Sequence, residues 1–99
     1  MLFASIYTYR EGYGEEMGKR LLQVFANWKP PAGYEIKAHY ELADGSGGIV
    51  LSEASTAAAA YEAAAAFTPF MHFRAAPVLD VAESVPIAAR VSAWRDSVH

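Results

Sequence analysis

The amino-acid sequence predicts a single α+β domain over residues 1–99, in the order strand, helix, strand, strand, helix, strand, helix. The hydrophobic pattern switches between the alternation of a strand and the period of about 3.6 residues of a helix at each step. A chain of 99 residues suffices for one such domain. Hydrophobic residues form 54% of the chain and charged residues 19%, so the chain can bury a core.

The first half of the chain is predicted to hold a strand, a helix and a second strand. Residues 2–9 alternate and are rich in aromatic and β-branched side chains. Residues 15–28 place apolar side chains on one helical face, and Pro30 and Pro31 end that helix. Residues 34–42 alternate again. One face is expected to carry Tyr34, Ile36, Ala38, Tyr40 and Leu42, and the other Glu35, Lys37, His39 and Glu41.

A glycine-rich hairpin and an alanine-rich helix follow. The loop over residues 44–48 leads to a short strand at 49–53, and Ser55 or Thr56 is suited to cap the next helix. Eight alanines favour this helix, which is expected to end near Phe67. Because alanine side chains are small, the helix can lie close to the sheet or leave space beneath it.

A fourth strand and a last helix complete the predicted fold. The strand is expected over residues 70–79. The helix is expected over about residues 84–98, with Ser84 as its N-cap and Pro86 in its first turn. Its apolar stripe consists of Ile87, Val91, Trp94 and Val98. The whole order is that of a ferredoxin-like βαββαβ fold with a C-terminal helix.

Both faces of the predicted sheet carry apolar side chains, which favours a homodimer. In the first strand, Leu2 and Ile6 point to one face and Phe3 to the other. The two crossover helices cover only one face, and an uncovered apolar face usually marks an interface. The simplest closed arrangement packs the sheet faces of two copies together. The alternative is a monomer in which the C-terminal helix covers the open face.

Charge and composition exclude several classes of function. A net charge of −3 with eight Lys and Arg residues does not suit a nucleic-acid-binding surface. The chain has no cysteine, which excludes disulfides, thiolate catalysis and cysteine-ligated metals. The three histidines lack a metal-ligand spacing, so no metal and no cofactor are expected. No apolar run is long enough for a membrane span, and the apolar start lacks the basic region of a signal peptide, so a cytoplasmic location is expected.

Three stretches of the chain carry a family resemblance. Residues 1–9 read Met-Leu-Phe-x-x-x-Tyr-Thr-Tyr, and residues 73–80 read Phe-x-x-x-Pro-Val-Leu-Asp. Between them, residues 45–61 hold a glycine-rich hairpin, a strand, Glu-Ala and an alanine-rich helix. In this order they resemble a small bacterial group with a domain of unknown function, within the dimeric α+β-barrel superfamily. That group often has Trp-His in its second strand, where this chain departs from it with His39 and Tyr40.

The resemblance implies a ferredoxin-like protomer whose sheet faces the sheet of a second copy. The wider superfamily includes cofactor-independent monooxygenases, polyketide cyclases, lactone isomerases and haem-degrading enzymes. In many of them the pocket lies between the sheet and the helices of one protomer. No particular activity is implied for the group of unknown function.

The candidates for catalysis are His39, His72 and Tyr7. His39 lies in the middle of the second strand, and a neutral imidazole can take or give a proton near pH 7. The alternative is a half-exposed histidine among charged neighbours. His72 and Arg74 share one face of the fourth strand and are suited to hold a carboxylate or an enolate. The alternative for this pair is an ion pair with an acidic side chain of the partner subunit.

The candidates for substrate binding are Arg74, Tyr40, Trp28 and Phe25. Tyr40 and Tyr7 can donate a hydrogen bond to a substrate oxygen, or each can satisfy a local partner. Trp28 and Phe25 can line a pocket for a flat ligand, or they belong to the core.

Two functions remain open for this sequence. The first is a small cofactor-independent monooxygenase, cyclase or isomerase that acts on an aromatic or polyketide-like ligand, and it predicts a cavity of roughly a few hundred Å³ between helices and sheet. The second is a non-catalytic ligand-binding or assembly module, and it predicts a filled core.

Overall fold

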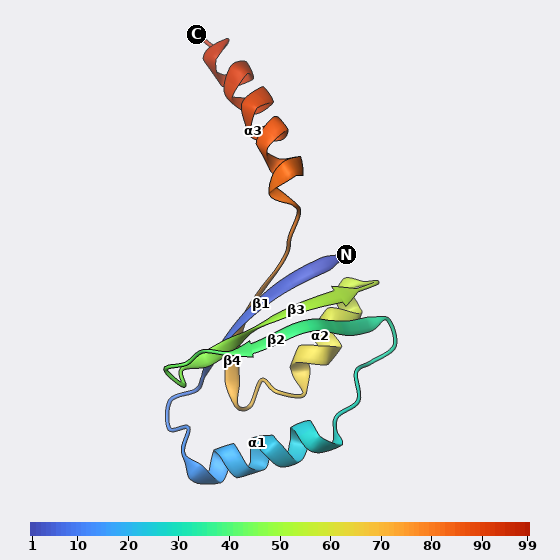
Figure 1. The fold of residues 1–99 in the computed structure, drawn as a ribbon, viewed down its shortest axis with the longest axis vertical. Coiled ribbons are helices and arrows are strands. Elements are labelled where there is room, and N and C mark those ends of the chain that lie inside the picture. Colours follow the sequence, from blue (N-terminus) through green and yellow to red (C-terminus); the bar gives the residue numbers. More distant parts are fainter.

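The computed structural model covers residues 1–99 and confirms the predicted order of strands and helices, in a ferredoxin-like α+β architecture (Figure 1). Four antiparallel strands form one sheet in the order β2-β3-β1-β4. Helices α1 and α2 lie on the same side of this sheet. The elements are β1 (Leu2–Tyr9), α1 (Glu15–Asn27), β2 (Tyr34–Glu41), β3 (Gly47–Ala54), α2 (Ala57–Ala65), β4 (Met71–Pro77) and α3 (Val81–Asp96).

The predicted faces of the second strand are wrong beyond Ile36, because β2 contains a β-bulge. Consecutive residues of β3 pair with Ile36 and Ala38, so Lys37 has no partner and the alternation shifts by one residue. The periodicity of the sequence carries no signal for this extra residue. On β2, the face toward α1 and α2 (the helix-side face) therefore carries Tyr34, Ile36, His39 and Glu41, and the opposite face (the open face) carries Glu35, Ala38 and Tyr40.

The core is small and lies between the helix-side face and α2. Its buried cluster consists of Tyr7, Val50, Phe67, Phe70 and Met71. Only 11 of the 99 residues are buried, because just one of the three helices packs closely on the sheet.

Helix α2 begins at the predicted cap and packs on the sheet through alanine. The Thr56 hydroxyl Oγ1 accepts a hydrogen bond from the Ala59 backbone N–H at 3.1 Å, so Thr56 and not Ser55 is the N-cap. Ala59 and Ala63 are the buried residues of this helix. The helix ends before Phe67, which turns back into the core.

Helix α1 lies farther from the sheet than α2 does (Figure 1). None of its residues is buried. Met17, Leu21 and Val24 are partly buried and reach the core cluster with their side chains. Long side chains, not close backbone packing, therefore connect α1 to the rest of the molecule.

The last strand and the last helix differ from their predicted bounds. β4 is shorter than the predicted strand, and α3 begins three residues early, after Asp80 as N-cap. Pro86 consequently lies inside the helix and not in its first turn. α3 projects away from the sheet (Figure 1), so the structure does not have the monomer arrangement in which this helix covers the open face. Its apolar side chains are exposed: Ile87, Val91, Trp94 and Val98 by 42%, 43%, 66% and 59%.

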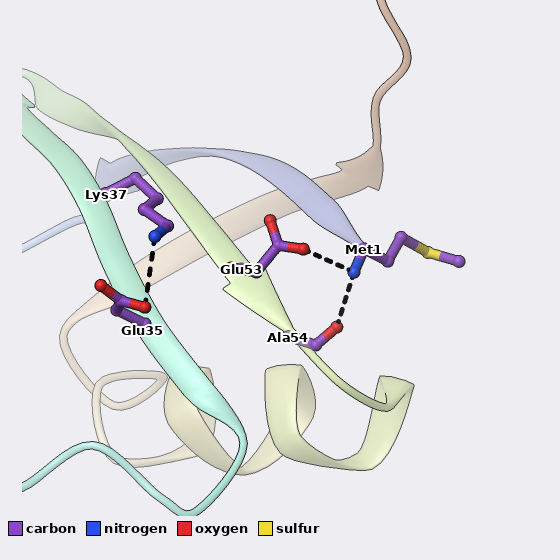
Figure 2. A network of polar contacts seen from close by, with 5 residues as sticks. All are labelled: Met1, Glu35, Lys37, Glu53 and Ala54. Carbon is purple, nitrogen blue, oxygen red and sulfur yellow. Dashed lines mark hydrogen bonds and ion pairs between the residues drawn. The ribbon is translucent and has the colours of Figure 1, made fainter.

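The open face combines an apolar centre with charged edges. Leu2 and Ile6 are exposed by 37% and 48%. Figure 2 shows two ion pairs near one end of the sheet: the Met1 ammonium lies 2.8 Å from Glu53 Oε1, and Lys37 Nζ lies 3.2 Å from Glu35 Oε2. The two carboxylates stand opposite each other on β2 and β3, and each has its own cation, which offsets their repulsion.

Candidate functional site

A cavity of about 460 Å³ lies between the helix-side face of the sheet, α1 and α2. It is lined by 23 residues, of which 19 are hydrophobic. The cavity exists because α2 presents alanines toward the sheet, while α1 is held away by larger side chains such as Leu21 and Phe25. The exceptions to the hydrophobic lining are Ser5, His39, Glu41 and Ser52, all from the sheet.

Aromatic rings form the wall of the cavity near the end of α1. The Phe25 and Trp28 rings lie nearly parallel, with centroids 6.3 Å apart and planes 22° apart. Trp28 meets Phe67 edge-on at 5.2 Å and Tyr34 edge-on at 6.4 Å. Such rings offer flat apolar surfaces to a ligand. Phe25 and Trp28, which the sequence offers as candidates for substrate binding, both line the cavity.

Tyr7 and His39 meet on the floor of the cavity. The Tyr7 hydroxyl lies 2.8 Å from His39 Nε2, in hydrogen-bonding distance. Tyr7 is 4% exposed, whereas His39 is exposed. The Phe25 ring covers the imidazole edge-on at 6.2 Å. A proton donor and a proton acceptor are therefore joined at the boundary between the cavity floor and the aromatic wall.

Gly48 allows Tyr7 to reach His39. Tyr7 pairs with Gly48 across β1 and β3, and the phenol lies over that glycine toward β2. A Cβ atom at position 48 would overlap the phenol of Tyr7 and the backbone oxygen of Tyr40. The absence of a side chain at Gly48 thus determines the path of the Tyr7 ring across β3.

A second polar pair extends the site toward the hairpin end of the sheet. The Tyr9 hydroxyl donates to both carboxylate oxygens of Glu41, at 2.8 and 2.9 Å. Tyr13 stacks on Tyr9 with centroids 4.3 Å apart. The Tyr7 and Tyr9 rings meet edge-on at 5.9 Å, so the two pairs form one continuous group.

Tyrosine is already protonated at neutral pH, and burial raises the pKa of both phenols further. Desolvation raises the pKa of Tyr7 above its usual value of 10.0, and the negative charge of Glu41 raises it further. Desolvation also raises the pKa of Tyr9, and its hydrogen bond to Glu41 and the charge of that carboxylate add to the effect. At neutral pH both hydroxyls are therefore hydrogen-bond donors.

The structure divides the predicted site residues between two faces of the sheet. His39, Tyr7, Trp28 and Phe25 all line the cavity. The other three are on the open face. The bulge in β2 turns Tyr40 to that face, and the pairing of β4 with β1 places His72 and Arg74 there. His72 Nε2 there lies 3.4 Å from a guanidinium nitrogen of Arg10. The predicted roles of these three would need a different site from the cavity.

Four further residues of this site carry no local signal in the sequence. Glu41, Tyr9, Ser5 and Ser52 line the cavity, and only the strand register brings them there. From the sequence, Gly47 and Gly48 are expected only as residues of the hairpin, and nothing indicates that the ring of Tyr7 lies over Gly48. No three of the His, Asp and Glu side chains come together as a group that could hold a metal ion. None of the helices combines the length and the apolar character needed to cross a membrane.

Fold and cavity together define a class: a small ferredoxin-like α+β protein with an aromatic cavity between its sheet and its helices. Within this class, the chain belongs to the family described as "Domain of unknown function (DUF3303)", whose model matches residues 1–92. The match confirms the resemblance to a family of unknown function and extends over most of α3. No curated protein and no solved structure matches the chain.

Proposed function

We propose that this protein binds a flat, largely apolar small molecule in the cavity and that His39 and Tyr7 exchange a proton with it. The observation that carries the proposal is the hydrogen-bonded Tyr7–His39 pair on the floor of an otherwise mainly hydrophobic cavity. Such a cavity, with few convergent polar groups, is typical of small-molecule sites. The ligand class is an aromatic or polyketide-like ketone or phenol.

The chemistry follows from the roles of the two groups. A ligand carbonyl oxygen accepts the hydrogen bond of the Tyr7 hydroxyl in place of His39. The freed Nε2 then removes a proton from the carbon next to the carbonyl, and the electrons of the broken C–H bond pass to the oxygen as an enolate. The protonated Tyr7 hydroxyl stabilises that enolate by donating a hydrogen bond to its oxygen.

Three reactions can start from such an enolate. Return of the proton from His39 to another carbon is an isomerisation, and attack on a second carbonyl of the ligand is a cyclisation. Reaction with molecular oxygen is an oxygenation that needs no cofactor. The shared step of all three is the loss of the proton next to the carbonyl, so this step is the one to test first.

Exchange of hydrogen for deuterium in 2-tetralone tests this step. The ketone is incubated with the protein in D₂O, and the loss of its enolisable protons is followed by nuclear magnetic resonance. We expect acceleration by the protein, and a loss of at least about tenfold in His39→Ala, since a positioned general base contributes roughly 10²–10⁴. The matched control is His99→Ala, which removes a histidine at the end of the chain.

The His72→Ala variant tests whether the exchange takes place on the helix-side face or on the open face of the sheet. Because His72 is on the open face, its removal is expected to leave the exchange rate within about twofold. Unchanged exchange in His39→Ala, or loss of exchange in His72→Ala, contradicts the proposed site. Calorimetric binding of 2-tetralone without any exchange favours the ligand-binding module over the enzyme.

A second candidate function is assembly with a second copy of this chain. The apolar stripe of α3 is exposed on a helix that projects away from the sheet, and Ile6 at the centre of the open face is exposed as well. A helix of 16 residues with an internal proline is marginal in water unless it packs on something. Two uncovered apolar surfaces on one chain fit a closed symmetric homodimer, in which each copy covers the other.

Light scattering on Ile6→Asp tests the homodimer. Ile6 is at the centre of the open face, so a buried aspartate there is expected to reduce the mass from dimer to monomer. Leu22→Asp is the control, because Leu22 is an exposed apolar residue on α1. A monomeric wild type at about 100 μM, or an unaltered dimer in Ile6→Asp, contradicts assembly through this face.

A further inference from the structure

We propose that Ser52 and Ser5 form a second hydrogen-bonding position in the cavity, which selects uncharged flat ligands that carry an oxygen at the end remote from His39. This inference rests on the proposed function and specifies the class of ligand.

Apart from the phenol of Tyr7, Ser52 has the only polar side chain among the buried residues, and it lines the cavity. It is 1% exposed. The side-chain hydrogen bonds on the cavity floor join Tyr7 to His39 and Tyr9 to Glu41, and Ser52 takes part in neither. Ser52 belongs to the lining of the cavity, so a ligand that packs on this part of the sheet comes next to its side chain. A hydroxyl without a partner in such surroundings costs stability, which a ligand oxygen can restore.

The strand register places Ser5 on β1 across Val50 from His39 on β2, with Ser52 on the strand between them. Ser5 and His39 both pair with Val50, one from β1 and the other from β2. Ser52 follows Val50 by two residues, which makes it a diagonal neighbour of both Ser5 and His39, at about 7–8 Å between Cα atoms. His39 and Ser5 are two strand spacings apart, about 10 Å. A ligand that covers Val50 can therefore meet the imidazole at one end and the serines at the other.

The charges in the cavity lining favour an uncharged ligand. Its only ionic side chains are Glu41 and, when protonated, His39, and it contains no Lys or Arg. A carboxylate or phosphate at the serine end would have no cation to bind. Serine hydroxyls both donate and accept hydrogen bonds, so they suit a ligand hydroxyl or carbonyl. The geometry points to a two-ring compound with an oxygen at each end.

Two naphthols that differ by one hydroxyl test the proposal. Isothermal titration calorimetry compares 2-naphthol with 2,6-dihydroxynaphthalene, which adds a hydroxyl at the far end of the ring system. Wild type is expected to bind the dihydroxy compound about three- to tenfold more tightly, the value of one additional hydrogen bond. In Ser52→Ala and in Ser5→Ala this ratio is expected to fall toward one, while the affinity for 2-naphthol stays within about twofold.

The controls separate this proposal from the proposed function. Ser84→Ala removes a serine on α3, whose hydroxyl donates to the Val81 carbonyl, and is expected to keep the wild-type ratio. Equal wild-type affinities for both naphthols, or an undiminished ratio in both cavity variants, overturns the serine position and leaves the cavity as a ligand site. If neither naphthol binds to wild type, the proposed function fails and the serine position fails with it. Circular dichroism of Ser5→Ala and Ser52→Ala shows whether each variant is folded.

Discussion

Gly48 is the residue on which the Tyr7–His39 contact depends most directly. Its lack of a side chain lets the phenol of Tyr7 cross β3 from β1 and reach His39 on β2. The same glycine pairs with Glu41 on the other edge of β3. One residue without chemistry of its own thus positions two polar groups of the site.

Replacement of Gly48 by alanine is expected to displace the Tyr7 ring. The new Cβ overlaps both the phenol and a backbone oxygen, so the variant should lose about 1–3 kcal/mol of stability. The exchange of 2-tetralone should fall together with it. Chemical denaturation measures the first effect, and nuclear magnetic resonance the second. Gly14→Ala is the control, because its nearest neighbouring atom is at 3.9 Å; equal losses in both variants would contradict this role of Gly48.

Helix α1 and helix α3 are both weakly held, but for different reasons. α1 touches the core through partly buried side chains over the cavity, while α3 leaves the body of the molecule after β4. Elements with few buried apolar contacts open at low free energy. Helices α1 and α3 are therefore expected to open more readily than the central strands β1 and β3.

Hydrogen exchange of the backbone is expected to report this difference between elements. In the free protein, amides of α1 should exchange faster than amides of the central strands, because no residue of α1 is buried. A ligand in the cavity adds contacts to Phe25 and Trp28, so it should slow exchange in α1. Mass spectrometry of peptic fragments measures both. Equal protection in α1 and β1 without ligand would contradict the weak attachment of the helix.

Substitution of Trp94 tests whether α3 contributes to the interface of the proposed homodimer. In an isolated chain this side chain is 66% exposed, so Trp94→Asp should change stability by less than about 0.5 kcal/mol. In the proposed homodimer the same change places a charge in the interface and should make the dimer dissociate at higher protein concentration. Light scattering at several protein concentrations measures the effect on dimer dissociation, and thermal unfolding measures the effect on stability. Ala89→Asp, which adds the same charge on the opposite side of α3, is the control, and equal effects of both variants would argue against a specific α3 contact.

The whole molecule should lose stability in strong base. Tyr7 and Tyr9 have pKa values above the ordinary 10.0 in the folded protein, so the folded state holds these protons more tightly than the unfolded chain does. The resulting stabilisation is complete below pH 10 and is lost as the pH rises through the raised pKa values. Denaturant unfolding at several values from pH 8 to 11 should show this decline. The Tyr7→Phe and Tyr9→Phe double variant should show a smaller one, and an identical decline would contradict the assignment.

At the scale of the whole chain, periodicity and turn chemistry sufficed to predict the element order. Alternation in residues 2–9, the Thr56 cap and the proline pair after α1 each act locally, so they can be recognised without knowledge of distant residues. Tyr7, His39, Phe25 and Trp28 could be proposed as site residues from their chemistry. Nothing local indicates, however, that all four share one cavity.

Register and packing over long distances decided the rest. The bulge at Lys37 puts His39 on the helix-side face, and Gly48 lets Tyr7 reach it, although these residues are far apart in sequence. The same register sends Tyr40, His72 and Arg74 to the open face. Local sequence specifies which elements form, because hydrogen bonding and side-chain periodicity act between near neighbours. Only the tertiary structure specifies which faces meet, because that depends on how strands pair and on the space that small residues leave between the sheet and its helices.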